Sequence, residues 1–106
     1  IIRPQDLEAL KDLFEKEDVN GINMVNIMGY GHQKGFTKFY RGKEYPVNLL
    51  PKIKVETVVA DECAEKLAGK IIETLQSGQA GDGKIFVYNI EDAYRIRTGE
   101  HGTEAL

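Results

Sequence analysis

The apolar residues of two stretches recur at the spacing of an α-helix. The first stretch runs from Pro4 to Asp18, and proline is well tolerated in the first turn of a helix. Its apolar stripe consists of Leu7, Leu10 and Phe14. The second stretch follows Asp61, a favourable N-cap residue, and ends at Ser77-Gly78, a common C-terminal signal. Its stripe consists of Ala64, Leu67, Ala68, Ile71 and Leu75. The pattern predicts two amphipathic helices.

Other stretches are typical of β-strands. Residues Leu50–Ala60 alternate strictly, which predicts a strand with one buried face. Residues Ile22–Met28 alternate less regularly, and Ile85–Ile90 are β-branched and aromatic without a helical period. We interpret Ile1-Ile2 as the end of a first strand that is truncated at the N-terminus.

The predicted elements follow one another as strand, helix, strand, long loop, strand, helix and strand. Two strand–helix–strand units in this order form the split βαβ arrangement. We therefore predict an α+β fold, ferredoxin-like with the order βαββαβ, as a single domain over residues 1–106. Ile53 and Val58 lie on opposite sides of one strand, so both faces of the sheet need cover, which association with other subunits would supply.

The segment Gly29–Asn48, between the second and third predicted strands, has no regular pattern. Glycines punctuate it, and it carries cationic side chains and tyrosines. A connection this long in a small domain is usually functional or mobile. We therefore expect this segment to have a role of its own.

Composition narrows the classes of function. The chain has 106 residues, 42% hydrophobic and 29% charged, as in an ordinary soluble domain with a modest core. A net charge of −3 argues against direct nucleic-acid binding. The single cysteine, Cys63, cannot form an internal disulfide, which favours a reducing cytosol. No apolar run reaches membrane-spanning length and no signal peptide is visible.

Candidate chemistry gathers in Ser77–Val87, SGQAGDGKIFV. The stretch nearly spells a P-loop, but Ile85 stands where Ser or Thr would bind magnesium, and a strand rather than a helix is predicted next. Its glycines still allow backbone N–H groups to approach a phosphate. Taken alone, the loop would more simply be a turn with a solvated lysine. Downstream, an extended RIRT would place Arg95 and Arg97 on one face, where two guanidinium groups suit phosphate oxygens.

SGQAGDGKIFV and RIRTGE, together with GYGHQKG and FYRGKEY farther back, resemble the pattern of the PII family of nitrogen-regulatory signal-transduction proteins. The similarity runs from Ile1 to Leu106. It implies a homotrimer that binds ATP or ADP in clefts between subunits, with a regulatory loop at about residues 31–50. The positions that match nucleotide contacts in the family are Gly29, Gly31, His32, Gln33, Glu56, Val58, Gly81, Asp82, Gly83, Lys84, Arg95 and Arg97.

The resemblance also implies an effector site. Gln33 would ligate magnesium on the ATP phosphates, since an amide oxygen is a ligand that magnesium accepts. The metal would in turn bind 2-oxoglutarate, whose contacts in the family match Gln33, Lys52 and Gly81.

Some positions depart from the family pattern. His32 stands where many members have an arginine that reaches the phosphates, and Asn23 stands where threonine is common near the adenine. Lys43 replaces the Ala or Ser that usually follows the glycine of FYRGKEY, so a serine phosphorylated in some members is absent. Tyr45, nucleotidylated in other members, is present, and Arg41 at the loop tip would suit insertion into a partner.

We therefore expect a trimeric, non-catalytic sensor of ATP, ADP, magnesium and 2-oxoglutarate. By resemblance, its partners are an ammonium transporter and enzymes or regulators of nitrogen assimilation. It would be cytoplasmic, and peripheral at the inner membrane only through the transporter. The alternative is a small enzyme that hydrolyses nucleotides or transfers a group from them with the same loop. The missing Ser or Thr after Lys84 and the lack of a general base beside it count against that alternative.

Overall fold

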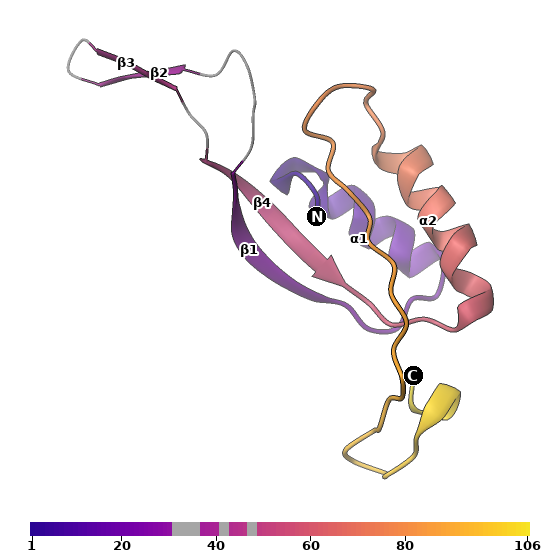
Figure 1. Cartoon of the computed structure of the whole chain (residues 1–106). Helices are drawn as coiled ribbons and strands as arrows, with labels where there is room; N and C mark the ends of the chain where they lie inside the picture. Colours follow the sequence, from indigo (N-terminus) through magenta and orange to yellow (C-terminus); the bar gives the residue numbers. More distant parts are fainter. Residues whose placement is uncertain (31–36, 41–42, 47–48) are drawn as a thin grey trace.

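Two helices pack against a long β-ribbon, and a small hairpin extends from one end of that ribbon (Figure 1). This computed structural model describes residues 1–30, 37–40, 43–46 and 49–106, with side chains described outside 31–48. The chain is therefore α+β, as predicted. In Figure 1 both helices lie on the same side of the ribbon, and the C-terminal residues lie at the end away from the hairpin.

The first helix begins with a single 3-10 turn, Pro4–Asp6, and continues as α1, Leu7–Lys16. The second, α2, spans Asp61–Leu75, with Ala60 rather than Asp61 at the N-cap. Their predicted apolar stripes face each other. The buried core consists of Ile2, Leu10, Phe14, Ile53, Leu67 and Leu75.

The ribbon pairs β1, Asn23–Tyr30, with β4, Leu49–Glu56, in antiparallel register from Asn23↔Glu56 to Tyr30↔Leu49. Both strands were predicted, although β4 ends four residues before Ala60. Just after it, the Thr57 hydroxyl donates a hydrogen bond to the carbonyl of Gly21 at 2.6 Å. The chain therefore leaves the sheet at Thr57 and turns towards α2.

The segment between β1 and β4 contains secondary structure that its sequence did not indicate. Strands β2, Thr37–Tyr40, and β3, Lys43–Pro46, pair antiparallel in a separate hairpin. The sequence pattern predicted a long connection here and did not indicate this hairpin. Cross-strand pairing of short segments depends on the turn between them and leaves little hydrophobic period to detect.

The predicted strand Ile85–Ile90 is not formed in the described chain. The backbone of Lys84 exchanges two hydrogen bonds with Ile1, at 3.0 and 3.1 Å, and no ladder continues beyond it among the described residues. A strand requires a backbone partner as well as β-forming side chains. Apart from its pairing with β1, β4 has one further backbone partner among the described residues, an isolated bridge between Ile53 and Ile2. The described sheets are consequently two-stranded, where a four-stranded ferredoxin-like sheet was expected.

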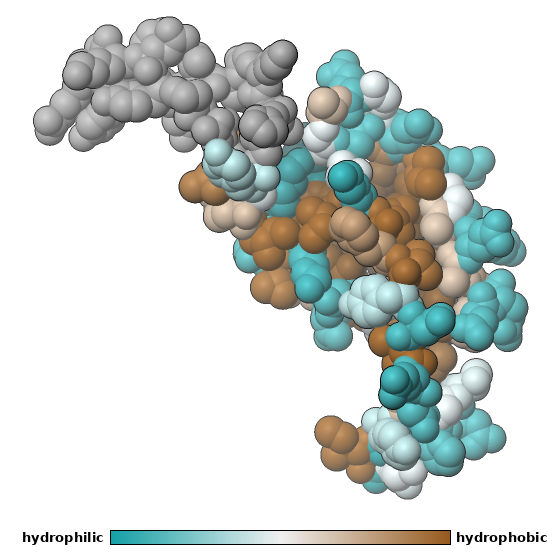
Figure 2. Space-filling view, in the orientation of Figure 1, coloured by the Kyte–Doolittle hydropathy of each residue, from teal (hydrophilic) through white to brown (hydrophobic). Residues whose placement is uncertain are grey.

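Apolar side chains remain exposed on β1 and along the unpaired residues 85–90. Val25 and Met28 of β1 are 55% and 61% exposed, and Phe86 and Val87 are 69% and 70% exposed. Figure 2 shows hydrophobic residues gathered over the middle of the molecule, between polar margins. Among the described residues, no helix has the length and apolar character to cross a membrane.

The end of α1 contains a left-handed residue that is not glycine. Asp18 has a φ of 55°, and the N–H of Val19 donates to the carbonyl of Phe14 at 2.9 Å. The Asp18 N–H donates to the carbonyl of Glu15 at 3.4 Å, which completes a Schellman motif. Glycine is the usual residue at this position because it has no Cβ to clash with the backbone.

Replacing Asp18 with glycine should stabilise the fold. The change removes a Cβ from a residue in the left-handed backbone conformation, where it costs roughly 1 kcal/mol. It also removes a negative charge at the negative end of the helix dipole. We expect a higher free energy of unfolding for Asp18→Gly in urea titrations, with an unchanged m-value. Asp12→Gly, within the same helix, serves as the opposite control and should destabilise. Equal effects of the two substitutions would contradict the assignment of a C-terminal cap at Asp18.

Candidate functional site

The glycine loop, residues 77–84, follows α2 and is bent by residues in left-handed conformations. Gly81 and Gly83 have φ values of 101° and 105°. Gly83 also lies against the N-terminal residue, since a Cβ there would stand 2.0 Å from the carbonyl oxygen of Ile1. Only glycine therefore permits both the backbone conformation and the close pairing of Lys84 with Ile1.

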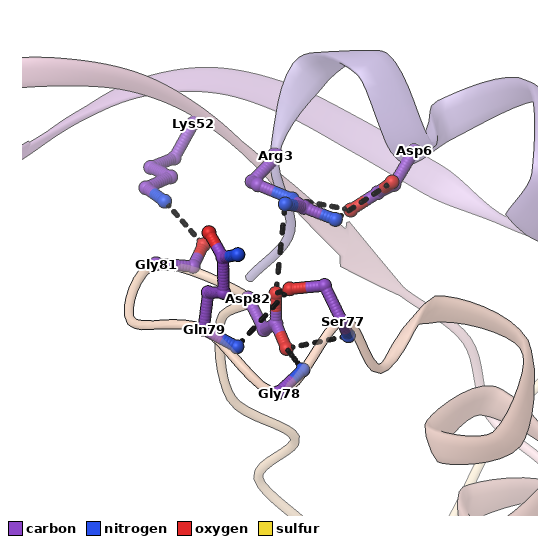
Figure 3. A network of polar contacts seen from close by, with 8 residues as sticks. All are labelled: Arg3, Asp6, Lys52, Ser77, Gly78, Gln79, Gly81 and Asp82. Atoms are coloured by element: carbon purple, nitrogen blue, oxygen red, sulfur yellow. Dashed lines mark hydrogen bonds and ion pairs between the residues drawn. The ribbon is translucent and has the colours of Figure 1, made fainter.

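The Asp82 carboxylate closes this loop on itself (Figure 3). It accepts hydrogen bonds from the N–H groups of Ser77, at 2.8 Å, and Gly78, at 3.1 Å, and from the Ser77 hydroxyl. The Ser77 hydroxyl lowers the pKa of Asp82 most, and the N–H groups of Ser77 and Gly78 and the nearby Arg3 lower it further. Asp82 is therefore held ionised as an internal acceptor of the loop.

Two cationic side chains contact the loop from other elements. The ammonium group of Lys52, on β4, donates to the carbonyl of Gly81 at 2.8 Å. Arg3 approaches from the start of the chain, with its Nη1 3.5 Å from Oδ1 of Asp82. Both contacts are visible in Figure 3. The loop is thus attached to the sheet and to the first helix as well as to α2.

The structure brings together two of the three predicted effector residues. Lys52 and Gly81 are in direct contact, while Gln33 lies outside the described residues. A Cβ on Gly29 would lie 3.2 Å from Cγ of Lys52. Gly29, predicted as a nucleotide contact, therefore makes room for the stem of Lys52 on its way to the loop.

The prediction for the backbone of the two arginines was wrong. Residues 96–98 form a turn, in which the N–H of Gly99 donates to the carbonyl of Arg95 at 2.8 Å. Arg95 and Arg97 therefore do not lie on one face of an extended strand. The guanidinium of Arg95 contacts Glu100 at 3.4 Å and the carbonyl of Leu106 at 3.2 Å, while Arg97 is exposed. Turn formation depends on Gly99, which adopts a positive φ.

The arginines and the glycine loop are also far apart in this chain. Figure 1 shows the loop after α2 at one end of the molecule and the C-terminal turn at the other. A single copy of the described chain therefore does not assemble the predicted phosphate site. The resemblance had implied clefts between subunits, and the structure describes one subunit.

Some of the remaining residues predicted to contact ligands or partners lie in the described parts of the chain, and others lie outside them. Glu56 ends β4 opposite Asn23 and contacts Lys54 at 3.0 Å, and Val58 is exposed. Tyr45 lies in β3 opposite Lys38. Outside the described residues lie Gly31, His32, Gln33 and Arg41.

Sequence reasoning missed Arg3 and Ser77. Ser77 marked the end of a helix, and its hydroxyl proves to bind the loop carboxylate five residues later. Arg3 is separated from Asp82 by most of the chain, and no local spacing connects them. Within the described parts of the chain, no cluster of His, Cys, Asp and Glu could hold a metal ion.

The described chain is a small α+β protein with a glycine loop braced against its sheet. Comparison with known proteins defines the family. The family model for nitrogen regulatory protein P-II matches residues 1–100. This chain belongs to the P-II family, which confirms the resemblance seen in its motifs.

Curated relatives of the same family are similar to this chain over its whole length. Nitrogen regulatory protein P-II of Rhizobium meliloti (strain 1021) is 48% identical over all 106 residues, which cover 95% of that protein. The protein of the same name from Haemophilus influenzae is 45% identical with the same coverage. Nitrogen regulatory protein P-II 2 of Methanothermobacter thermautotrophicus is 42% identical, with 92% of its length covered.

The low pKa of Asp82 predicts how the loop responds to acid. Because folding lowers this pKa, the stabilisation is present above the unfolded pKa and is lost as the pH falls through the folded one. The amide NMR signals of Ser77 and Gly78 should therefore shift together, with a midpoint below the ordinary value of 3.8. Asp82→Asn should abolish this shared transition. Titration of both amides at or above 3.8 would contradict the network.

Proposed function

We propose that this protein is a non-catalytic nitrogen-status signalling protein that binds ATP or ADP through its glycine loop. Membership of the P-II family over residues 1–100 is the observation that carries the proposal. The names of the relatives describe nitrogen regulation. The loop geometry adds a physical reason for an anionic ligand.

Free backbone donors of the loop support the proposal of an anionic ligand. Among the described residues, no acceptor lies in hydrogen-bonding geometry with the N–H groups of Gly81 and Gly83. Lys84, next in the chain, has an exposed side chain. Backbone N–H groups in a turn can form an anion-binding concavity, to which an ammonium group adds charge.

Association into a homotrimer completes this proposed site. The exposed apolar residues of β1 and of 85–90 would be covered by neighbouring subunits. Arg95 and Arg97 of one subunit would then approach the glycine loop of the next. The ferredoxin-like sheet belongs to the same proposal, because Ile1-Ile2 lies between Ile53 and Lys84, where the first strand of such a sheet would lie.

Regulation would pass from this site to the loop at about residues 31–50. Magnesium held by Gln33 and by ATP would bind 2-oxoglutarate, with Lys52 and Gly81 on the effector side. Ligands would shift the loop only by their differential affinity for its arrangements. Arg41 and Tyr45 would meet cytoplasmic partners, namely an ammonium transporter at the inner membrane and enzymes or regulators of nitrogen assimilation.

The nucleotide site predicts the effect of removing its cations. Lys84→Ala and Arg97→Ala should each weaken ATP binding, because each removes a charge-assisted hydrogen bond worth roughly 1.5–3 kcal/mol. The dissociation constant measured by calorimetry should rise about tenfold or more. Lys11→Ala, on the exposed face of α1, is the matched control and should bind as the parent does. Normal affinity in both loop and arginine variants would refute the site, whereas ATP turnover would favour the enzyme alternative.

The proposed effector site predicts that one ligand must bind before the other. Binding of 2-oxoglutarate should need Mg-ATP, because the metal on the phosphates supplies its open coordination positions. Lys52→Ala and Gln33→Ala should reduce 2-oxoglutarate affinity more than ATP affinity. Titrations with and without Mg-ATP test this directly. Equal binding in the two titrations would rule out a metal-bridged effector.

A further inference from the structure

Arg3 holds two carboxylates at once, and they belong to different parts of the fold. Its Nε and Nη2 donate to the two oxygens of Asp6, at 2.8 and 3.3 Å. Its Nη1 lies 3.5 Å from Oδ1 of Asp82. Asp6 immediately precedes α1, whereas Asp82 lies in the glycine loop. The guanidinium therefore joins the loop to the start of the first helix.

The orientation of Arg3 is fixed by Asp6. A paired contact with both carboxylate oxygens leaves a planar guanidinium little freedom to rotate. The side chains are also partly shielded, at 26% exposure for Arg3, 13% for Asp6 and 23% for Asp82. Nη1 is thus directed at Asp82 by the neighbouring pair, and Arg3 is already engaged before any ligand arrives.

We propose that Arg3 is a positioning residue for the glycine loop, which acts through Asp82 and does not touch the nucleotide. Asp82 orders the first half of the loop by accepting from Ser77 and Gly78. Arg3 anchors that same carboxylate from outside. The second half, with Gly81 and Gly83, is thereby held in the conformation that presents its N–H groups. This inference rests on the proposed nucleotide site.

The physical basis is preorganisation. Glycines leave many loop conformations open, so ordering them on binding costs conformational entropy. Ligand affinity falls in proportion to the fraction of molecules in the competent conformation. Loss of the Arg3 contact should lower that fraction without removing any ligand contact.

A double-mutant cycle tests the inference. The cycle compares the parent with Arg3→Gln, Asp82→Asn and the double variant. Lys11→Gln is the control, because it breaks an exposed ion pair between Lys11 and Glu8, both in α1. Arg3→Gln should raise the dissociation constant for ATP about two- to fivefold, as expected for a partly exposed pair. In the Asp82→Asn background the same substitution should have almost no further effect. Lys11→Gln should leave binding unchanged.

A second readout needs no nucleotide. Amide exchange at Ser77 and Gly78, followed by NMR in the free protein, should accelerate in Arg3→Gln and in Asp82→Asn, and no further in the double variant. This arm decides the inference even if the parent protein fails to bind ATP, a result that would overturn only the proposed function. Unchanged exchange in Arg3→Gln would overturn the positioning role. So would an equal loss of ATP affinity in both backgrounds, because Arg3 would then act on the ligand directly.

Discussion

The pairing of Ile2 with Ile53 is the contact on which the position of the glycine loop depends. The two residues exchange backbone hydrogen bonds of 2.9 Å in each direction, and both side chains are buried in the core. Ile1, the residue before Ile2, exchanges backbone hydrogen bonds with Lys84. The sheet therefore fixes the end of the loop through two adjacent backbone pairs. The absence of a side chain at Gly83 is required by this arrangement.

The helices and the ribbon could be predicted because their signals are local. Leu10, Phe14, Leu67 and Leu75 show the helical period, and all are buried. Ile53 lies at the centre of a strictly alternating stretch and is buried too. At these five positions an apolar side chain in a periodic pattern indicates the buried face.

Other features depend on distant partners, and the sequence alone does not reveal them. The residues 85–90 have the composition of a strand, but a strand forms only beside another one. Arg95 and Arg97 alternate as in a strand, yet Gly99 allows a turn that separates them. The contact between Arg3 and Asp82 joins residues far apart in the sequence, so no local motif could indicate it.

Lys52 connects the glycine loop to the end of the ribbon that is next to the hairpin. Lys52 reaches Gly81 from β4, and β4 begins only three residues earlier, at Leu49. Leu49 is paired with Tyr30, so residues 31–48 leave and rejoin the ribbon at that end. In the proposed effector site, a ligand carboxylate that competes with the Gly81 carbonyl for Lys52 would act close to this end of the ribbon. The stem of Lys52 passes close to Gly29, which has no side chain to obstruct it, so Lys52 also lies beside the end of β1. Under the proposed function, a signal from the glycine loop would reach this end of the ribbon through the Lys52 side chain.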